Sequence, residues 1–138
     1  MSSQMAVLRL PASIESFEPF RSFALAELER ESGLAALLPR LELVLEELLI
    51  NIINYAYRGG EGEIEVECEA PNPKEFRLRI RDWGAPFNPL EQQNPDLSAD
   101  IQSREVGGVG IFLVKQMTSG LTYQRLNGAN ILTAWFEN

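Results

Sequence analysis

The stretch from Leu41 to Arg58, LELVLEELLINIINYAYR, constrains the fold of this chain more than any other stretch. Its apolar residues leave almost no polar face, which is typical of a helix that a sheet and neighbouring helices cover on most sides. Glu47 and Asn51 nevertheless stand four residues apart in it, so both project from one face of the helix. Asn54 and Tyr55 continue the same stripe. Burying such groups costs free energy unless something pairs with them, and a ligand is one candidate partner.

The alternative interpretation of this stripe is structural. In it, Glu47 lies at the edge of the helix in water, and Asn51 caps a neighbouring backbone group, because hydrogen-bonded amides are common in protein cores. The pair alone therefore does not establish a ligand site, and the rest of the chain has to decide between the two interpretations.

The composition predicts one globular domain spanning residues 1–138 and disfavours several functions. With 45% hydrophobic and 23% charged residues, the chain is long enough to bury a core without disulfides. A net charge of −8 argues against direct nucleic-acid binding and suits a basic partner, or a site that holds a cation between carboxylates and an anion. The chain has no histidine, so acid or base chemistry falls to carboxylates. A single cysteine, Cys68, and the lack of a signal peptide or spanning apolar run predict a cytoplasmic location away from membranes.

The first half of the chain predicts a strand and two helices. Ala6 to Leu10 is typical of a short strand that Pro11 ends. A helix is expected from about Ile14 to Arg30, with a start nearer Phe17 because Pro19 fits only within a first turn. Pro39 can likewise occupy the first turn of the long helix, which is expected to close at the Gly59–Gly60 pair.

Two alternating segments follow, and their charges are complementary. In GEIEVECEA every second residue is acidic, and in FRLRIRD every second residue is basic, so each segment predicts a strand with one face on the core and one in water. The PNPK turn between them makes the strands antiparallel neighbours with cross-strand ion pairs.

The last part of the chain predicts a loop, a helix and a hairpin. The polar stretch from Leu90 to Val106 is long for a loop in a compact domain, which indicates a lid or binding loop. Glycines then lead into a helix that ends near Gly120, and Asn127–Gly128 predicts the turn of a final hairpin. This order of elements indicates an α+β fold: a two-layer sandwich with a mixed, mostly antiparallel sheet and helices on one face.

Three motifs together favour a nucleotide over the structural interpretation. Asp82 ends a strand and is followed by Gly84, where the backbone can approach a group that Asp82 holds, although an isolated D-x-G is more often a turn. The run from Gly107 to Gly110 opens a helix whose N–H groups and dipole can bind phosphate, although it could also be a flexible loop. Asp82 would accept a hydrogen bond from an exocyclic amine, Asn51 would coordinate Mg²⁺ through its amide oxygen, and Glu47 would activate a nucleophile.

These motifs resemble the Asn box and the two glycine boxes of the superfamily of gyrase, heat-shock chaperone, histidine kinase and mismatch-repair ATPases. They are ELLIN at Glu47 to Asn51, DWG at Asp82 to Gly84, and GGVG at Gly107 to Gly110. Within that superfamily, NIINYAY and GGVGIFLVKQM are most similar to the small anti-sigma factor serine-protein kinases of bacterial partner-switching systems. The resemblance spans nearly the whole chain.

The resemblance implies a Bergerat ATP-binding fold with ATP and Mg²⁺ as cofactors. Carried over by position, Glu47 would be the catalytic base, with Arg104 a cation near the γ-phosphate. Asn51 would be the metal ligand. The implied cofactor-binding residues are Asn51, Asn54, Asp82, Gly84, Gly107, Gly108, Val109, Gly110 and Asn130, the last where relatives use a threonine near adenine. Tyr55 departs from the family, which often has histidine at that position.

The leading hypothesis is an ATP-binding anti-sigma regulatory factor with protein-serine/threonine kinase activity. Its substrate would be a small anti-sigma factor antagonist of the STAS type, a sigma factor or another regulatory target would compete with that antagonist for binding to the protein, and the protein would be a homodimer. The alternative is a non-catalytic ATP-sensing module in which nucleotide only orders the loop before the glycines and so exposes or hides a partner surface.

Overall fold

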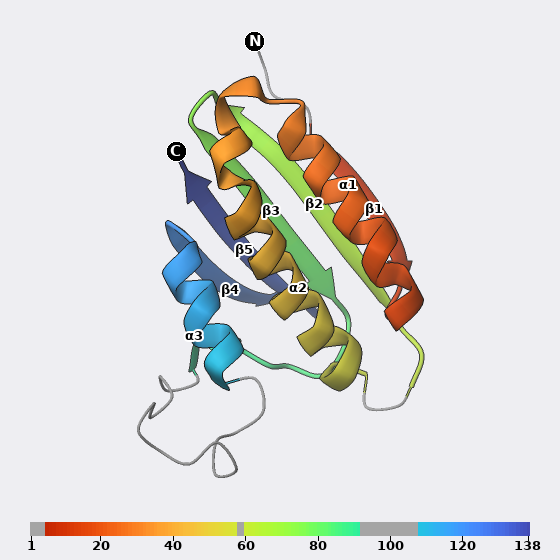
Figure 1. Ribbon diagram of the computed structural model, residues 1–138. Coiled ribbons are helices and arrows are strands. Elements are labelled where there is room, and N and C mark those ends of the chain that lie inside the picture. Colours follow the sequence, from red (N-terminus) through yellow and green to blue (C-terminus); the bar gives the residue numbers. More distant parts are fainter. Residues whose placement is uncertain (1–4, 58–59, 92–107) are drawn as a thin grey trace.

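The computed structural model describes residues 5–57, 60–91 and 108–138, and its elements form two layers (Figure 1). The strands are β1 (Ala6–Pro11), β2 (Glu63–Asn72), β3 (Glu75–Asp82), β4 (Gly120–Leu126) and β5 (Ala129–Glu137). The α-helices are α1 (Phe17–Glu29), α2 (Leu38–Tyr55) and α3 (Gly108–Met117). Short 3-10 helices cover Ile14–Ser16, Ser32–Leu37 and Pro89–Glu91.

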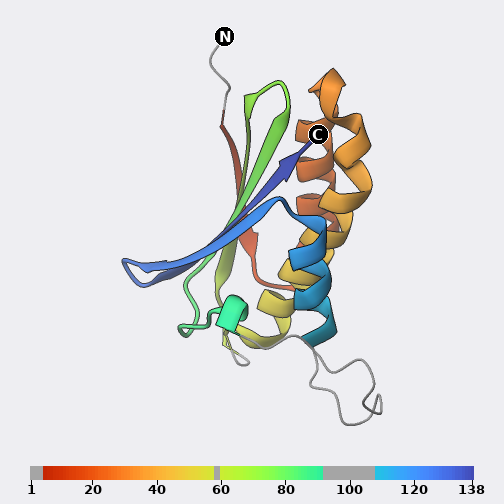
Figure 2. The ribbon, with the colours of Figure 1, turned by 90° about the vertical axis from the view of Figure 1, so that its left-hand side faces the viewer.

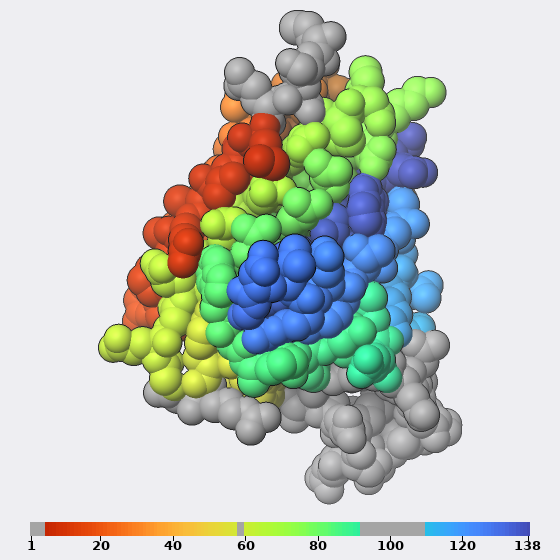
Figure 3. Space-filling view, turned by 180° about the vertical axis from the view of Figure 1, so that it is seen from behind, coloured from red at the N-terminus to blue at the C-terminus, as the bar shows by residue number. Residues whose placement is uncertain are grey.

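The strands form one sheet in the order β1-β2-β3-β5-β4. The three α-helices of the described residues pack on one face of this sheet (Figure 2), so none of them lies on the opposite, helix-free face, which Figure 3 shows. This confirms the predicted α+β two-layer fold. Each strand pairing in the described part of the chain is antiparallel, so the mixed pairing that was expected is not found there.

The core lies between the sheet and the helices, as the alternation of the strands predicts. Ile64, Val66 and Cys68 of β2 are fully or almost fully buried, and so are the inward residues of β3. From the helix layer, fully buried Phe20 of α1 and Leu45 of α2 pack into the same cluster. Burying a leucine or phenylalanine side chain contributes about 1.5–3 kcal/mol, so this cluster fixes α2 against the centre of the sheet.

The predicted ion pairs between β2 and β3 form on the helix-free face of the sheet. The register pairs three acidic residues of β2 each with one basic residue of β3. The pairs are Glu65–Arg81 at 2.8 Å, Glu67–Arg79 at 3.3 Å and Glu69–Arg77 at 2.7 Å. We call these six side chains the charged ladder. The sequence predicts that this face is exposed to water, but the six paired side chains are only 9–32% exposed.

Element boundaries differ from the predictions at helix ends. Helix α2 begins at Leu38 with proline in its first turn, as predicted, but ends at Tyr55 rather than at the glycine pair. Helix α3 begins at Gly108, so the last two glycines of the run belong to its first turn. The predicted hairpin turn is confirmed, since Asn127 and Gly128 have φ angles of 52° and 78°. None of the helices in the described residues is long and apolar enough to cross a membrane.

Candidate functional site

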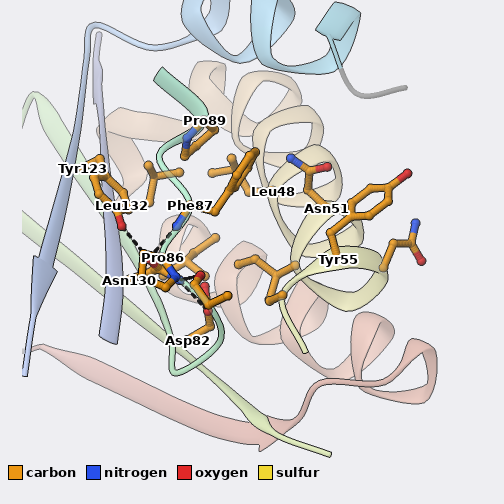
Figure 4. A pocket seen from close by; sticks show the side chains of 15 residues that line it. Leu48, Asn51, Tyr55, Asp82, Pro86, Phe87, Pro89, Tyr123, Asn130 and Leu132 are labelled. Atoms are coloured by element: carbon orange, nitrogen blue, oxygen red, sulfur yellow. Dashed lines mark hydrogen bonds between the residues drawn. The ribbon is translucent and has the colours of Figure 1, made fainter. Parts of the chain in front are cut away.

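A cavity of about 450 Å³ lies between α2, the segment after β3, and strands β4 and β5 (Figure 4). It combines an apolar wall with a few polar groups, which is the usual composition of a small-molecule site. Its lining residues are Leu48, Asn51, Ile52, Asn54, Tyr55, Ala56, Ile80, Asp82, Ala85, Pro86, Phe87, Pro89, Tyr123, Asn130 and Leu132. The sequence-predicted residues Asn51, Asn54, Asp82 and Asn130 are thus brought together from three separate parts of the chain.

Asp82 is the buried carboxylate of this cavity. Only 5% of it is exposed, because it ends a central strand beneath the segment that follows. Its Oδ1 accepts hydrogen bonds from the backbone N–H of Gly84 at 2.9 Å and from Nδ2 of Asn130 at 3.0 Å. No described residue hydrogen-bonds to its Oδ2. One oxygen is therefore held by the protein, and the other is left for a donor on a ligand.

Asn130 lies directly beside Asp82, because the two residues are register partners on β5 and β3. Its Nδ2 also donates to the carbonyl oxygen of Ala85 at 2.9 Å. Its Oδ1 accepts hydrogen bonds from the backbone N–H of Phe87 at 3.2 Å and from the Tyr123 hydroxyl at 2.5 Å. We call Asp82, Asn130, Tyr123 and the segment 84–87 the Asp82 end of the cavity.

The segment 84–87 is held between α2 and the β4–β5 hairpin. The N–H of Ala85 donates to the carbonyl oxygen of Ala56 at 3.2 Å, and Arg125 donates to the carbonyl oxygen of Gly84 at 2.8 Å. A Cβ at Gly84 would lie 2.3 Å from the Ala56 oxygen, so only glycine permits this approach. Gly84 does not itself line the cavity, and its hydrogen-bonded N–H orients Asp82 instead.

Tyr57 connects Trp83, the residue just before the segment 84–87, to the start of β2. Its hydroxyl donates to the carbonyl oxygen of Glu63 at 2.5 Å and accepts from the backbone N–H of Trp83 at 2.8 Å. Burial raises the pKa of Tyr57, so the phenol stays neutral and keeps both roles. The Arg9 guanidinium stacks 4.1 Å from the Trp83 ring and covers this junction from β1.

The polar stripe of α2 divides between the cavity and α3. Asn51 is half-buried and Asn54 is exposed, and the side-chain amide of neither residue has a hydrogen-bond partner within the described ranges. Glu47 does not line the cavity. Its Oε2 lies against α3, where a Cβ at Gly110 would come within 2.2 Å of it. Burial, and then the nearby Glu46 carboxylate, raise the pKa of Glu47. We call Asn51 and Asn54, together with Glu47 beside them on α2 but outside the cavity lining, the Asn51 end.

Several predicted residues lie outside what the structure describes. Arg104, Gly107 and the predicted lid from Leu90 to Val106 fall wholly or mostly within the undescribed range 92–107. Gly108, Val109 and Gly110 form the start of α3, which lies beside α2 (Figure 1). Of the glycine run, Gly110 is thereby placed against the Glu47 carboxylate.

Sequence reasoning missed the residues that hold the Asp82 end together. Tyr57, Tyr123 and Arg125 carry none of the spacing that marked the motifs, and their contacts depend on strand pairing. Tyr57 belongs to the NIINYAY segment, but the helical spacing of that segment singles out Tyr55 and gives no signal for Tyr57. Tyr55 lines the rim of the cavity and is 50% exposed.

A Mg²⁺ site built only from protein carboxylates is not present in the described residues, which contain no group of three or more acidic, cysteine or histidine side chains placed for a metal. The unpartnered amide of Asn51 at the cavity wall fits a different arrangement. Mg²⁺ is commonly held by one or two protein oxygens together with phosphate oxygens and water. A single amide oxygen here is compatible with Mg²⁺ that arrives with a nucleotide.

The two-layer fold, with helices on one face of an antiparallel sheet and a cavity between them, is that of a class of ATPase domains. The chain belongs to that class: residues 10–136 match the family of histidine kinase-like ATPase domains. Domains of this family bind ATP.

Two relatives refine this placement. The chain is 31% identical over 93 residues to the serine/threonine-protein kinase BtrW of Bordetella bronchiseptica, a match that covers 67% of this chain and 66% of BtrW. Its structure is similar to that of the RsbU and RsbW domains of Rv1364c from Mycobacterium tuberculosis, with a TM-score of 0.64 over 97% of this chain and 32% of that one. The sequence identity there is 14%, so this second likeness shows the fold alone. The chain thus spans just under two thirds of BtrW and about a third of the mycobacterial chain.

Proposed function

We propose that this chain is one ATPase domain over residues 1–138 that binds Mg-ATP, phosphorylates a serine or threonine of a small antagonist protein, and acts as an anti-sigma regulatory factor. The observation that carries the proposal is the free Oδ2 of buried Asp82, in a cavity that Asn51 lines from α2. A carboxylate buried to this degree is costly unless it is paired, so its open acceptor calls for a ligand with an N–H donor. The exocyclic amine of adenine is such a donor.

In this proposal, the base and the phosphates of the nucleotide occupy different ends of the cavity. The base would lie at the Asp82 end, between the apolar side chains of Leu48 and Ile52 on α2 and of Phe87 on the facing segment. The phosphates would extend toward Asn51, whose amide oxygen would hold Mg²⁺ with them. The glycines before and within α3 would offer backbone N–H groups to the phosphates, with Arg104 as a neighbouring cation.

Glu47 is the proposed general base for the incoming hydroxyl group. Its raised pKa makes it a stronger base than an ordinary glutamate, and it stands one helical turn before Asn51. Phosphoryl transfer depends mostly on positioning and charge neutralisation, so one carboxylate, one metal ion and a closing loop suffice. The similarity to a serine/threonine-protein kinase supports this assignment.

A second candidate function is a non-catalytic ATP-sensing module, and one observation favours it. The Glu47 carboxylate lies against Gly110 of α3 and is not among the cavity-lining groups. In such a module, nucleotide would only reorganise α3 and the loop before it and thereby change a partner surface.

The partners follow from the kinase proposal. A STAS-type antagonist would be the phosphate acceptor, a sigma factor or another regulatory target would compete with it, and the domain would act as a homodimer. The net charge of −8 favours basic surfaces on these partners.

One experiment tests the proposal and separates the two candidates. The protein is first titrated with Mg-ADP by calorimetry, and is then incubated with γ-labelled Mg-ATP and the antagonist encoded beside it. Binding followed by label on a serine or threonine of the antagonist is expected. Binding without label transfer would replace the kinase by the sensing module, and the absence of binding would refute both.

A further inference from the structure

The side chain of Asn130 has no hydrogen-bonding capacity left for a ligand. A primary amide offers two N–H donors and one oxygen with two lone pairs. Both donors are used, toward Asp82 Oδ1 and the Ala85 carbonyl oxygen. Both lone pairs are used as well, by the Phe87 N–H and the Tyr123 hydroxyl. Because Asn130 is only 6% exposed, these four contacts define its environment.

The contacts of Asn130 join every part of the Asp82 end. They connect the strand-end carboxylate, two backbone groups of the segment 84–87, and a hydroxyl from β4 (Figure 4). The carboxylate is thereby held through Oδ1 alone, which leaves its Oδ2 as the oxygen that remains open. An amide in this position is also neutral at every pH, so it donates to a carboxylate without competing for its proton.

We propose that Asn130, supported by Tyr123, is a positioning residue that selects a 6-amino purine by holding Asp82 with Oδ2 toward the base, and that it does not itself contact the nucleotide. This inference rests on the proposed nucleotide function. It replaces the sequence-based expectation of a direct contact to adenine by an action through Asp82.

The test replaces Asn130 by the isosteric acid, Asn130→Asp. The introduced carboxylate repels Asp82 Oδ1 and the Ala85 carbonyl oxygen, while it still accepts from Phe87 and Tyr123. When pH is lowered, one proton shared by the two carboxyl groups restores a donor between them. Among the described residues, the ionisable side chains near the pair are Tyr123, which hydrogen-bonds to Asn130, Arg125, which hydrogen-bonds to the Gly84 carbonyl oxygen, and Tyr57, whose pKa is raised by burial.

The dissociation constants of Mg-ADP and Mg-IDP are measured for the wild type and the variant at about pH 8 and about pH 5.5. IDP carries a carbonyl oxygen in place of the 6-amine and a proton on N1, so it cannot donate an N–H from position 6 to Asp82 Oδ2. At the higher pH we expect Asn130→Asp to bind ADP about tenfold or more weakly and IDP nearly as before, with the ADP preference largely restored at the lower pH. Comparing variant with wild type at each pH removes the titration of the nucleotide phosphates.

Thr133→Val is the matched control, because Thr133 is a buried residue of the same strand whose hydroxyl faces Arg79 on the opposite side of the sheet. It should leave the ADP-to-IDP preference unchanged. If Asn130→Asp does not fold, Tyr123→Phe takes its place and should reduce the ADP preference about threefold.

The outcomes separate this inference from the proposed function. A wild type that binds ADP, with a preference over IDP that neither variant changes at either pH, overturns the positioning role and leaves nucleotide binding intact. A wild type that binds neither nucleotide refutes the proposed function, and the positioning role with it.

Discussion

The Asp82 end of the cavity is held by hydrogen bonds within the protein, whereas the Asn51 end presents polar side chains that find no such partners among the described residues. At the first end, Asp82 and Asn130 are 5% and 6% exposed, and their contacts join three strands and a loop. At the second end, Asn51 is half-buried and Asn54 exposed on one helix. Burial accounts for the difference, because water can solvate the second group of side chains but not the first.

Under the proposed function, this contrast would separate recognition of the base at the Asp82 end from phosphate chemistry at the Asn51 end. A contact that must choose one base over another benefits from groups that are already in place, since a preorganised site loses less entropy on binding. Groups that must meet Mg²⁺, phosphates and a protein hydroxyl in succession need freedom to move. We therefore expect substitutions at the two ends to change different measurements.

The largest expected effect is on phosphate transfer at the Asn51 end. Glu47→Gln keeps the size of the side chain but removes the base, so the transfer rate to the antagonist should fall by about 10²–10⁴-fold. The dissociation constant of Mg-ADP should stay within about threefold, because Glu47 does not line the cavity. The measurement is single-turnover transfer of label together with calorimetry.

Glu29→Gln is the matched control, since Glu29 is an exposed glutamate on the neighbouring helix α1. The pH profile provides a second check. Only the deprotonated form of Glu47 accepts a proton, and its pKa is raised by burial, so transfer should decline on acidification at a pH above the ordinary glutamate value of about 4.3. A variant that transfers phosphate at the wild-type rate would remove Glu47 from the role of base.

The next effect is on affinity at the Asp82 end. Asp82→Asn can still accept from Gly84 and Asn130 through its oxygen, but it places an amide where Oδ2 faces the base. The N–H group of the introduced amide then faces the exocyclic N–H of adenine, so neither can accept a hydrogen bond from the other. ADP affinity should fall by about 10–100-fold, the equivalent of one lost charge-assisted hydrogen bond. Calorimetry at constant magnesium measures it, with Glu65→Gln on the helix-free face as the control. An unchanged affinity would place the base elsewhere.

Much of the scaffold follows from local patterns. The alternation of acidic and basic residues predicted the pairing of β2 with β3 and the presence of ion pairs between them, because a period of two assigns each side chain to a face. The Asn127–Gly128 turn was predicted for a similar reason, since few residues adopt positive φ. The stripe of Asn51 and Asn54 on α2 was predicted from helical spacing.

The organisation of the Asp82 end could not be predicted in this way. Asn130 and Asp82 are 48 positions apart, and their contact exists only because β5 pairs with β3 in one register. Gly84 was interpreted as a glycine that lets the backbone approach a ligand, yet the space it leaves is occupied by Ala56 at the end of α2. The end of α2 at Tyr55 was also missed, because the tertiary contact at Ala56 and not the glycine pair marks that boundary.

A smaller effect is expected on stability where α2 meets the Asp82 end. In Gly84→Ala the new methyl group would press on the backbone of Ala56, which cannot move aside as a flexible side chain could. Overpacking of this kind costs about 1–3 kcal/mol of unfolding free energy, measured by urea denaturation. Gly33→Ala is the control, because a Cβ there would meet its nearest neighbour at an ordinary 3.4 Å. Equal stability of the two variants would show that the segment 84–87 is not held against α2.

The smallest effect is expected in the charged ladder, which lies on the face of the sheet away from the cavity. Glu65 and Arg81 pair at 2.8 Å, and their side chains are 16% and 30% exposed. A double-mutant cycle of Glu65→Gln and Arg81→Gln should give a coupling of about 0.2–1 kcal/mol, which decreases as salt is added. ADP affinity should not change in any member of the cycle, even though Arg81 precedes Asp82 in the chain, because adjacent residues of a strand face opposite sides of the sheet. A change in affinity together with the coupling would show that the Asp82 end depends on this face as well, and that its hydrogen bonds do not hold it alone.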